Sequence, residues 1–202
     1  MGIAEKVREK AEQLPLGHPV SVNAFMSCGN RAAVDQALTR LVKAGILSRP
    51  ARGIYVRPRR NSYIGEVPPE PISVAEAIAQ GFGGMVQIHG AEAARRLGFS
   101  TQVPARPVFY TSGPNRRFHL GQMEVTLKHV CPRKLALAGR PAGTAFTALW
   151  YLGKNSVTPD TIEQIRARLA PEEFEALRMA TPSMPGWMRN AFVGHEASAR
   201  HA

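Results

Sequence analysis

The chain of 202 residues has few cysteines and no long hydrophobic run. Its two cysteines, Cys28 and Cys131, are too few for a disulfide framework, so we expect both to be free thiols. No apolar stretch approaches the roughly 18 residues that a membrane-spanning helix needs, which argues against membrane contact. The first residues lack the hydrophobic segment of a secretory signal. We therefore expect a cytoplasmic protein.

Side chains that could hold catalytic metal ions are also scarce. The only aspartates are Asp35 and Asp160, which do not form the paired motif that a nucleotidyltransferase needs. His129 and Cys131 have no second pair at zinc-site spacing. Ser112 has no histidine and acid arrangement near it in the sequence. The sequence thus predicts no enzyme, no metal and no cofactor.

Positive charge is what the sequence has in excess. Its 26 Lys and Arg outnumber 15 Asp and Glu, giving a formal net charge of +11 at pH 7. An excess of this size favours polyanionic partners, of which nucleic acid is the commonest. Between Arg31 and Gly65 seven further cations face a single acid, Asp35. A solvated basic face without a ligand is the alternative that composition leaves open.

The N-terminal third carries the pattern of three helices followed by a hairpin. Ser21 is the expected N-cap of the second helix, and apolar residues at helical spacing predict a third helix over residues 31–44. Gly45 would end that helix. Residues 46–56 alternate as two short strands, and Gly53 permits a positive φ at their turn. This order predicts a winged helix-turn-helix.

The exposed face of the third helix is the candidate DNA-reading surface. Arg pairs bidentately with guanine, and Asn or Gln pairs with adenine, so these residue types suit readout of the major groove. The basic hairpin would bring its arginines to phosphates or to the minor groove. The alternative is a polar helix face that meets only water. The candidate DNA-binding residues are Asn30, Arg31, Gln36, Thr39, Arg40, Lys43, Arg49, Arg52 and Arg57.

A proline-rich segment separates this pattern from the rest. Residues 57–71 contain four prolines and a glycine without apolar periodicity, as is typical of a linker. Beyond it, alternating stretches predict three strands of an antiparallel sheet, and helices finish the chain. The predicted fold class is α+β, with a helical C-terminal tail. The expected domains are a winged helix-turn-helix at 1–62, a linker at 63–72 and an α+β domain at 73–202.

Two motifs carry a resemblance to a known family. The stretch "RGIYVRP" after the winged helix, and "GAEAARRLGFSTQVPARPVFYTSGPNRRFHLG" at Gly90–Gly121, resemble the AbiEi antitoxins of bacterial type IV toxin-antitoxin systems. The resemblance covers roughly Ile3 to Leu152, with Phe99 where Leu is common. It implies a repressor that binds double-stranded DNA at its own promoter through the N-terminal domain. It also implies counteraction of a nucleotidyltransferase-like toxin, with or without a stable complex.

The second domain offers a basic sheet surface to such a partner, or to a nucleic acid shared with it. A strand edge protected by charge is the alternative. A second function class also stands, namely a transcription regulator whose C-terminal domain senses a ligand or forms a homodimer. The candidate partner-binding residues are Gln102, Tyr110, Thr111, Arg116, Arg117 and Lys128.

Overall fold

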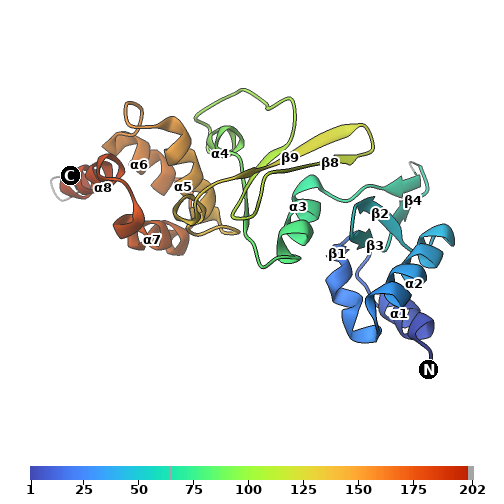
Figure 1. Cartoon of the computed structure of the whole chain (residues 1–202). Helices are drawn as coiled ribbons and strands as arrows, with labels where there is room; N and C mark the ends of the chain where they lie inside the picture. The colour runs from blue at the N-terminus through green and yellow to red at the C-terminus, as the bar shows by residue number, and fades with distance from the viewer. Residues whose placement is uncertain (64, 200–202) are drawn as a thin grey trace. The chain divides into compact units, whose positions relative to one another are not determined.

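The structure is a computed structural model that describes residues 1–63 and 65–199. Ile64, in the expected linker, and the last three residues of the expected second domain lie outside the described residues. The chain divides into two compact units (Figure 1). The first is Met1–Gly84 with Arg116–Thr126, and the second is Met85–Asn115 with Leu127–Ala202. Helices and small antiparallel sheets alternate along the chain, so the predicted α+β fold class is confirmed.

The first unit begins with a winged helix-turn-helix. Its helices are α1 (Ile3–Glu12), the 3-10 helix η1 (Val22–Cys28) and α2 (Arg31–Lys43). Its strands are β1 (Pro19–Ser21), β2 (Ser48–Ala51) and β3 (Ile54–Val56), in the spatial order β1-β3-β2. We call the β2–β3 hairpin the wing. The apolar faces of these elements share one core, because each helix has a buried stripe that must be covered.

The ends of these elements follow local sequence signals. The Ser21 side chain accepts a hydrogen bond from the amide of Asn23 and caps η1, as predicted. Gly45 has φ +69° just after α2, and the amides of Gly45 and Ile46 donate to carbonyls of the last turn. This Schellman arrangement satisfies the end of the helix. Gly53, with φ +77°, lies in the wing turn.

The segment that reads as a linker contains a second hairpin. Strand β4 (Arg59–Asn61) pairs antiparallel with β5 (Gly65–Val67). Part of the proline-rich segment 57–71 is therefore a β-hairpin. Helix α3 (Pro71–Gln80) follows and belongs to the first unit. There the side-chain amide of Asn23 donates to the carbonyl oxygen of Gly81 at 3.0 Å. That residues 1–62 fold alone stays a prediction.

A four-stranded sheet follows α3 in the chain. Its strands are β6 (Val86–Ile88), β7 (Val108–Thr111), β8 (Arg116–Leu120) and β9 (Met123–His129), in the order β6-β7-β9-β8. The last three were predicted from alternation and lie where expected. Helix α4 (Gly90–Arg96) connects β6 to the segment before β7. Strand β8 and the beginning of β9 belong to the first unit, the other strands to the second.

Helices complete the second unit. They are α5 (Pro141–Leu152), α6 (Pro159–Arg166), α7 (Pro171–Met179) and α8 (Gly186–Ala199), with the short 3-10 helices η2 (Pro132–Leu135) and η3 (Thr181–Ser183). The predicted helical tail is present, and α8 extends it beyond the prediction. The rings of Phe174 and Phe192 stack at 6.4 Å between α7 and α8. None of the described helices has the length and apolar character needed to cross a bilayer.

Candidate nucleic-acid interface

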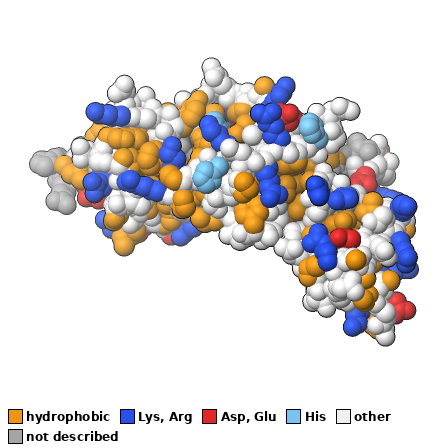
Figure 2. All heavy atoms as spheres, in the orientation of Figure 1, with side chains coloured by type: hydrophobic (Ala, Val, Ile, Leu, Met, Phe, Trp, Pro, Cys, Tyr) orange, Lys and Arg blue, Asp and Glu red, His pale blue; other side chains and the backbone are white. Residues whose placement is uncertain are grey.

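The exposed face of α2 carries most of the predicted DNA-reading residues. Gln36, Arg40 and Lys43 are exposed and, with Thr39, line a shallow hollow beside the helix. The opposite face is buried, and Leu38 is completely so, because residues three to four apart share one side of a helix. In Figure 2, Lys and Arg side chains gather along the side of the first unit that carries α2 and β4 in Figure 1.

Two of the predicted contacts bond to the backbone of the helix instead. The Oδ1 atom of Asn30 accepts a hydrogen bond from the amide of Ala33 at 2.9 Å, so Asn30 is the N-cap of α2. The hydroxyl of Thr39 donates to the carbonyl oxygen of Asp35 at 2.7 Å. Because base readout needs these polar atoms, Asn30 is better described as a cap than as a base contact.

Arg31 is held by an ion pair that is easily exchanged. Its Nε lies 2.8 Å from Oδ2 of Asp35, one turn later on α2, and both side chains are about half exposed. Such a surface pair is worth about 0.3–0.5 kcal/mol, and less when the cation precedes the acid. A bidentate contact with guanine discriminates by about 1–3 kcal/mol. The contact with guanine is the stronger of the two, so it can replace the ion pair with Asp35 and Arg31 is available to a nucleic acid.

The wing presents one restrained arginine and one free arginine. The pairing of β2 with β3 is irregular between Ser48 and Ala51, where Pro50 lies on the edge strand. The guanidinium of Arg49 stands 5.8 Å from the centroid of the Tyr55 ring. Arg52 is exposed at the wing turn, and no carboxylate pairs with it within residues 1–63 and 65–199. Arg52 is therefore the wing's freest cation.

Arg57 has a structural role within the first unit. Its Nη1 donates to the carbonyl oxygens of Glu12, at 2.6 Å, and Leu14, at 3.4 Å. These carbonyls belong to the end of α1 and the residues after it, which no later turn of helix satisfies. This role makes Arg57 less available than the exposed arginines around it, and its contact with DNA stays a prediction.

The sequence reading missed two arginines beside the interface. Arg59 and Arg60 lie on β4, and both are exposed. A Cβ built on Gly45 would stand 3.6 Å from Nη2 of Arg60, so this guanidinium lies at the carboxyl end of α2. A cation is favourable there, at the negative end of the helix dipole. The signal is the run "RPRR", which adds to the positive charge of the N-terminal part but carries no apolar periodicity.

The arginines of the second unit are paired differently. In three of its helices a glutamate holds an arginine three residues later, at 2.6 to 2.8 Å. The pairs are Glu92 with Arg95, Glu163 with Arg166 and Glu175 with Arg178. The stretch from Gln36 to Gly65 in the first unit has seven cations and no acid. Both units are basic, but the unpaired arginines concentrate around α2, the wing and β4.

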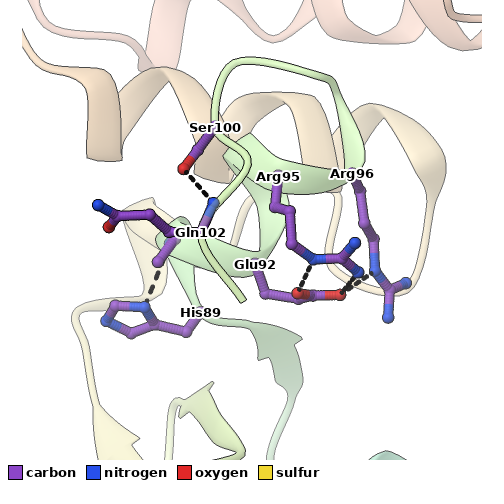
Figure 3. A network of polar contacts seen from close by, with 7 residues as sticks. His89, Glu92, Arg95, Arg96, Ser100 and Gln102 are labelled. Atoms are coloured by element: carbon purple, nitrogen blue, oxygen red, sulfur yellow. Dashed lines mark hydrogen bonds and ion pairs between the residues drawn. The ribbon is translucent and has the colours of Figure 1, made fainter. Parts of the chain in front are cut away.

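Helix α4 shows this pairing in close-up. In Figure 3, Arg95 and Arg96 converge on the carboxylate of Glu92, with Nε to oxygen distances of 2.8 Å for each. The hydrogen bond from Arg95 is the largest cause that lowers the pKa of Glu92 to about 2. The two guanidinium groups are therefore partly neutralised on the helix itself, which makes them weak anchors for an external anion.

The predicted partner-binding residues are divided between the two units. Arg116 and Arg117 lie on β8 in the first unit, whereas Gln102, Tyr110, Thr111 and Lys128 belong to the second. Thr111 is completely buried, and its Oγ1 accepts a hydrogen bond from the amide of Gly113. Successive strand residues face opposite sides, so Thr111 points inward with Phe109. The prediction of Thr111 as a partner contact was wrong.

His89 interacts with two of the predicted partner-binding residues of the second unit, Tyr110 and Lys128. Its ring lies 4.8 Å from the ring of Tyr110, and its Nδ1 accepts the amide hydrogen of Ala91 at the start of α4. Burial, and secondarily the charge of Lys128, lower the pKa of His89. Burial raises the pKa of Tyr110, against a backbone hydrogen bond from Gly90. Gln102 and Lys128 are exposed, whereas His89 and Tyr110 are half-buried.

Comparison with known proteins identifies the family of the chain. Residues 6–177 match DUF6088, a family of unknown function. The chain belongs to this family. The matched range of this DUF6088 member includes α2, the wing and the four-stranded sheet. No curated protein matches it. Among solved structures it is similar to the RV2827C protein from Mycobacterium tuberculosis, at 15% identity and a TM-score of 0.46, over 96% of this chain and 78% of that one.

Proposed function

We propose that this protein is a DNA-binding antitoxin that represses its own operon and counteracts a nucleotidyltransferase-like toxin. The observation that carries the DNA-binding part is the winged helix-turn-helix whose exposed helix face and wing hold unpaired cations. Seven cations without an acid follow one another from Gln36 to Gly65, and six of them are exposed. A chain that needed charge only for solubility would not require this local segregation.

The division of labour within the interface follows from side-chain chemistry. With α2 in the major groove, Gln36 would read adenine and Arg31 guanine after leaving Asp35. Arg40 and Lys43, near the carboxyl end of α2, and Arg52 on the wing would bind phosphates. Arg49 would approach the backbone with its guanidinium supported by the Tyr55 ring.

The antitoxin part rests on the resemblance of Gly90–Gly121 to AbiEi proteins. Of the predicted partner-binding residues in the second unit, Gln102 and Lys128 are exposed and Tyr110 is half-buried. Their chemistry suits either a protein surface or the nucleic acid on which the toxin acts. Genomic context is the first check, since an adjacent nucleotidyltransferase gene is expected.

The DNA-binding experiment compares duplexes carrying the sequence upstream of the gene with a scrambled duplex. The Gln36→Ala variant should reduce the preference for the upstream duplex by about 1–3 kcal/mol, because it removes a base contact. The Arg52→Ala variant should weaken both duplexes alike and flatten the slope of log affinity against log salt by about 0.9. The control is Arg189→Ala, which removes an exposed arginine of α8.

Wild-type protein that binds neither duplex at low salt would refute the proposal. Equal losses on both duplexes for Gln36→Ala would show that this residue reads no base. Co-expression with the adjacent toxin, scored by growth, tests the second activity. Retained DNA binding without rescue of growth would favour a plain transcription regulator.

A further inference from the structure

Strand β8 brings Arg117 and His119 near the wing, within the first unit. Leu120, the last residue of β8, and Gly121 in the turn after it line a pocket together with wing residues Ser48, Arg49 and Pro50. The other wall of the pocket is Glu66, Pro68 and Pro69. A segment that follows Arg49 by about 70 residues in the sequence thus lies against the strand that carries this wing arginine.

The two faces of β8 differ in chemistry. The guanidinium of Arg116 stacks over the ring of Phe82, 5.4 Å from its centroid, and Phe118 is half-buried. Arg117 and His119 point to the opposite face, because side chains alternate along a strand, and both are exposed. They lie about 6.8 Å apart along the strand, at 3.4 Å per residue. One face anchors the strand, and the other presents an arginine and a histidine to solvent.

The two outward side chains have few acidic neighbours. No carboxylate pairs with Arg117 in the part of the chain that the structure describes, and it makes no ring contact there. The nearest acid to His119 is Glu124, with Nε2 and Oε2 4.0 Å apart. The strand is at the edge of its sheet. Charge of either sign would protect an edge from aggregation, whereas a phosphate backbone would select positive charge.

We propose that Arg117 and His119 on β8 form a second contact with the backbone of duplex DNA, beside the wing. The proposal rests on the DNA-binding function above and extends its footprint beyond the winged helix-turn-helix. It assigns Arg117 to DNA rather than to a toxin partner. The two side chains reach phosphates on the wing side of the site, where a longer duplex has backbone and a short one has none.

The test uses the full chain and two labelled mixed-sequence duplexes, one of about 12 bp, close to one helical turn, and one of about 24 bp. The Arg117→Gln variant should bind the longer duplex more weakly than wild type and the shorter one equally. Its salt slope on the longer duplex should be shallower by about 0.9, so that the difference from wild type shrinks about threefold between 50 and 200 mM salt. Arg117→Lys should keep the wild-type slope.

Arg189→Gln is the matched control, because it removes the same charge from an exposed site on α8. Arg117→Gln that behaves like this control on both duplexes would overturn the inference. If Arg52→Ala weakens binding while Arg117→Gln does not, only the contact at β8 fails and the proposed function stands. Wild-type protein that binds neither duplex would overturn both. Lost toxin counteraction with unchanged DNA binding would return Arg117 to the toxin surface.

Discussion

Replacing Gly143 with alanine tests how closely α5 packs in the second unit. Gly143 is buried in the first turn of α5. A Cβ built there would lie 2.0 Å from the carbonyl oxygen of Leu137 and 2.7 Å from Nε2 of Gln87. The first contact is with backbone, which cannot rotate away as a flexible side chain does. Only glycine fits this approach of two chain segments.

The expected change in unfolding free energy has the opposite sign to that of a glycine-to-alanine change at an ordinary helix position. An unobstructed glycine-to-alanine change within a helix gains about 1 kcal/mol. An added methyl group in a packed core costs about 1–3 kcal/mol, and the short contact with Leu137 places Gly143 at the upper end. The gain in helix propensity offsets about 1 kcal/mol of this cost. We therefore expect the Gly143→Ala variant to lose about 2 kcal/mol of unfolding free energy net. For a chain of this size the melting temperature would fall by about 4–8 °C.

Thermal and urea unfolding followed by circular dichroism measure this loss. The matched control is Gly186→Ala at the start of α8, where an added Cβ meets nothing within 4 Å. The control should be as stable as wild type or slightly more so. A Gly143→Ala protein as stable as the control would refute the reasoning, because it would mean that α5 can move away from Leu137 at little expense.

Two further predictions concern charged groups of the second unit. Hydrogen bonds from Arg95 above all, and from Arg96, hold the pKa of Glu92 at about 2, so their stabilisation is present above about pH 4.5 and is lost as the pH falls toward 2. The Glu92→Gln variant should therefore lose less stability than wild type when unfolding is measured across that range. Because the charge of Lys128 adds to the burial that lowers the pKa of His89, Lys128→Gln should raise that pKa in an NMR titration, though not to the full extent. An unchanged titration would place the ammonium group away from the ring.

The winged helix-turn-helix could be predicted because several independent signals coincide. The apolar stripe of α2, the cap at Ser21, and the glycines at positions 45 and 53 each favour the same order of elements. The β4–β5 hairpin could not be predicted. Its strands are three residues long, and all of Arg59–Asn61 is exposed, so no face is buried and no alternation appears in the sequence.

The candidate interface was predictable in outline and not in detail. Helical periodicity places Gln36, Arg40 and Lys43 on the outside because Leu38 must be inside. Residue type does not say what a polar side chain contacts. Asn suits both adenine readout and helix capping, and Arg suits both phosphate and backbone carbonyl oxygens. Only the structure shows that Asn30 caps α2 and that Arg57 donates hydrogen bonds to carbonyl oxygens at the end of α1.

Asp35 is the one carboxylate of α2, and its position among cations would favour some anions over others. Any polyanion that approaches the helix is attracted by Arg40 and Lys43 but repelled by Asp35, and it must also displace that carboxylate from Arg31. An anion that offers Arg31 no bidentate partner gains little at this point, because it only replaces one weak ion pair by another. A duplex that offers guanine to Arg31 gains a bidentate partner in exchange. One acid among many cations would thus trade general affinity for selectivity.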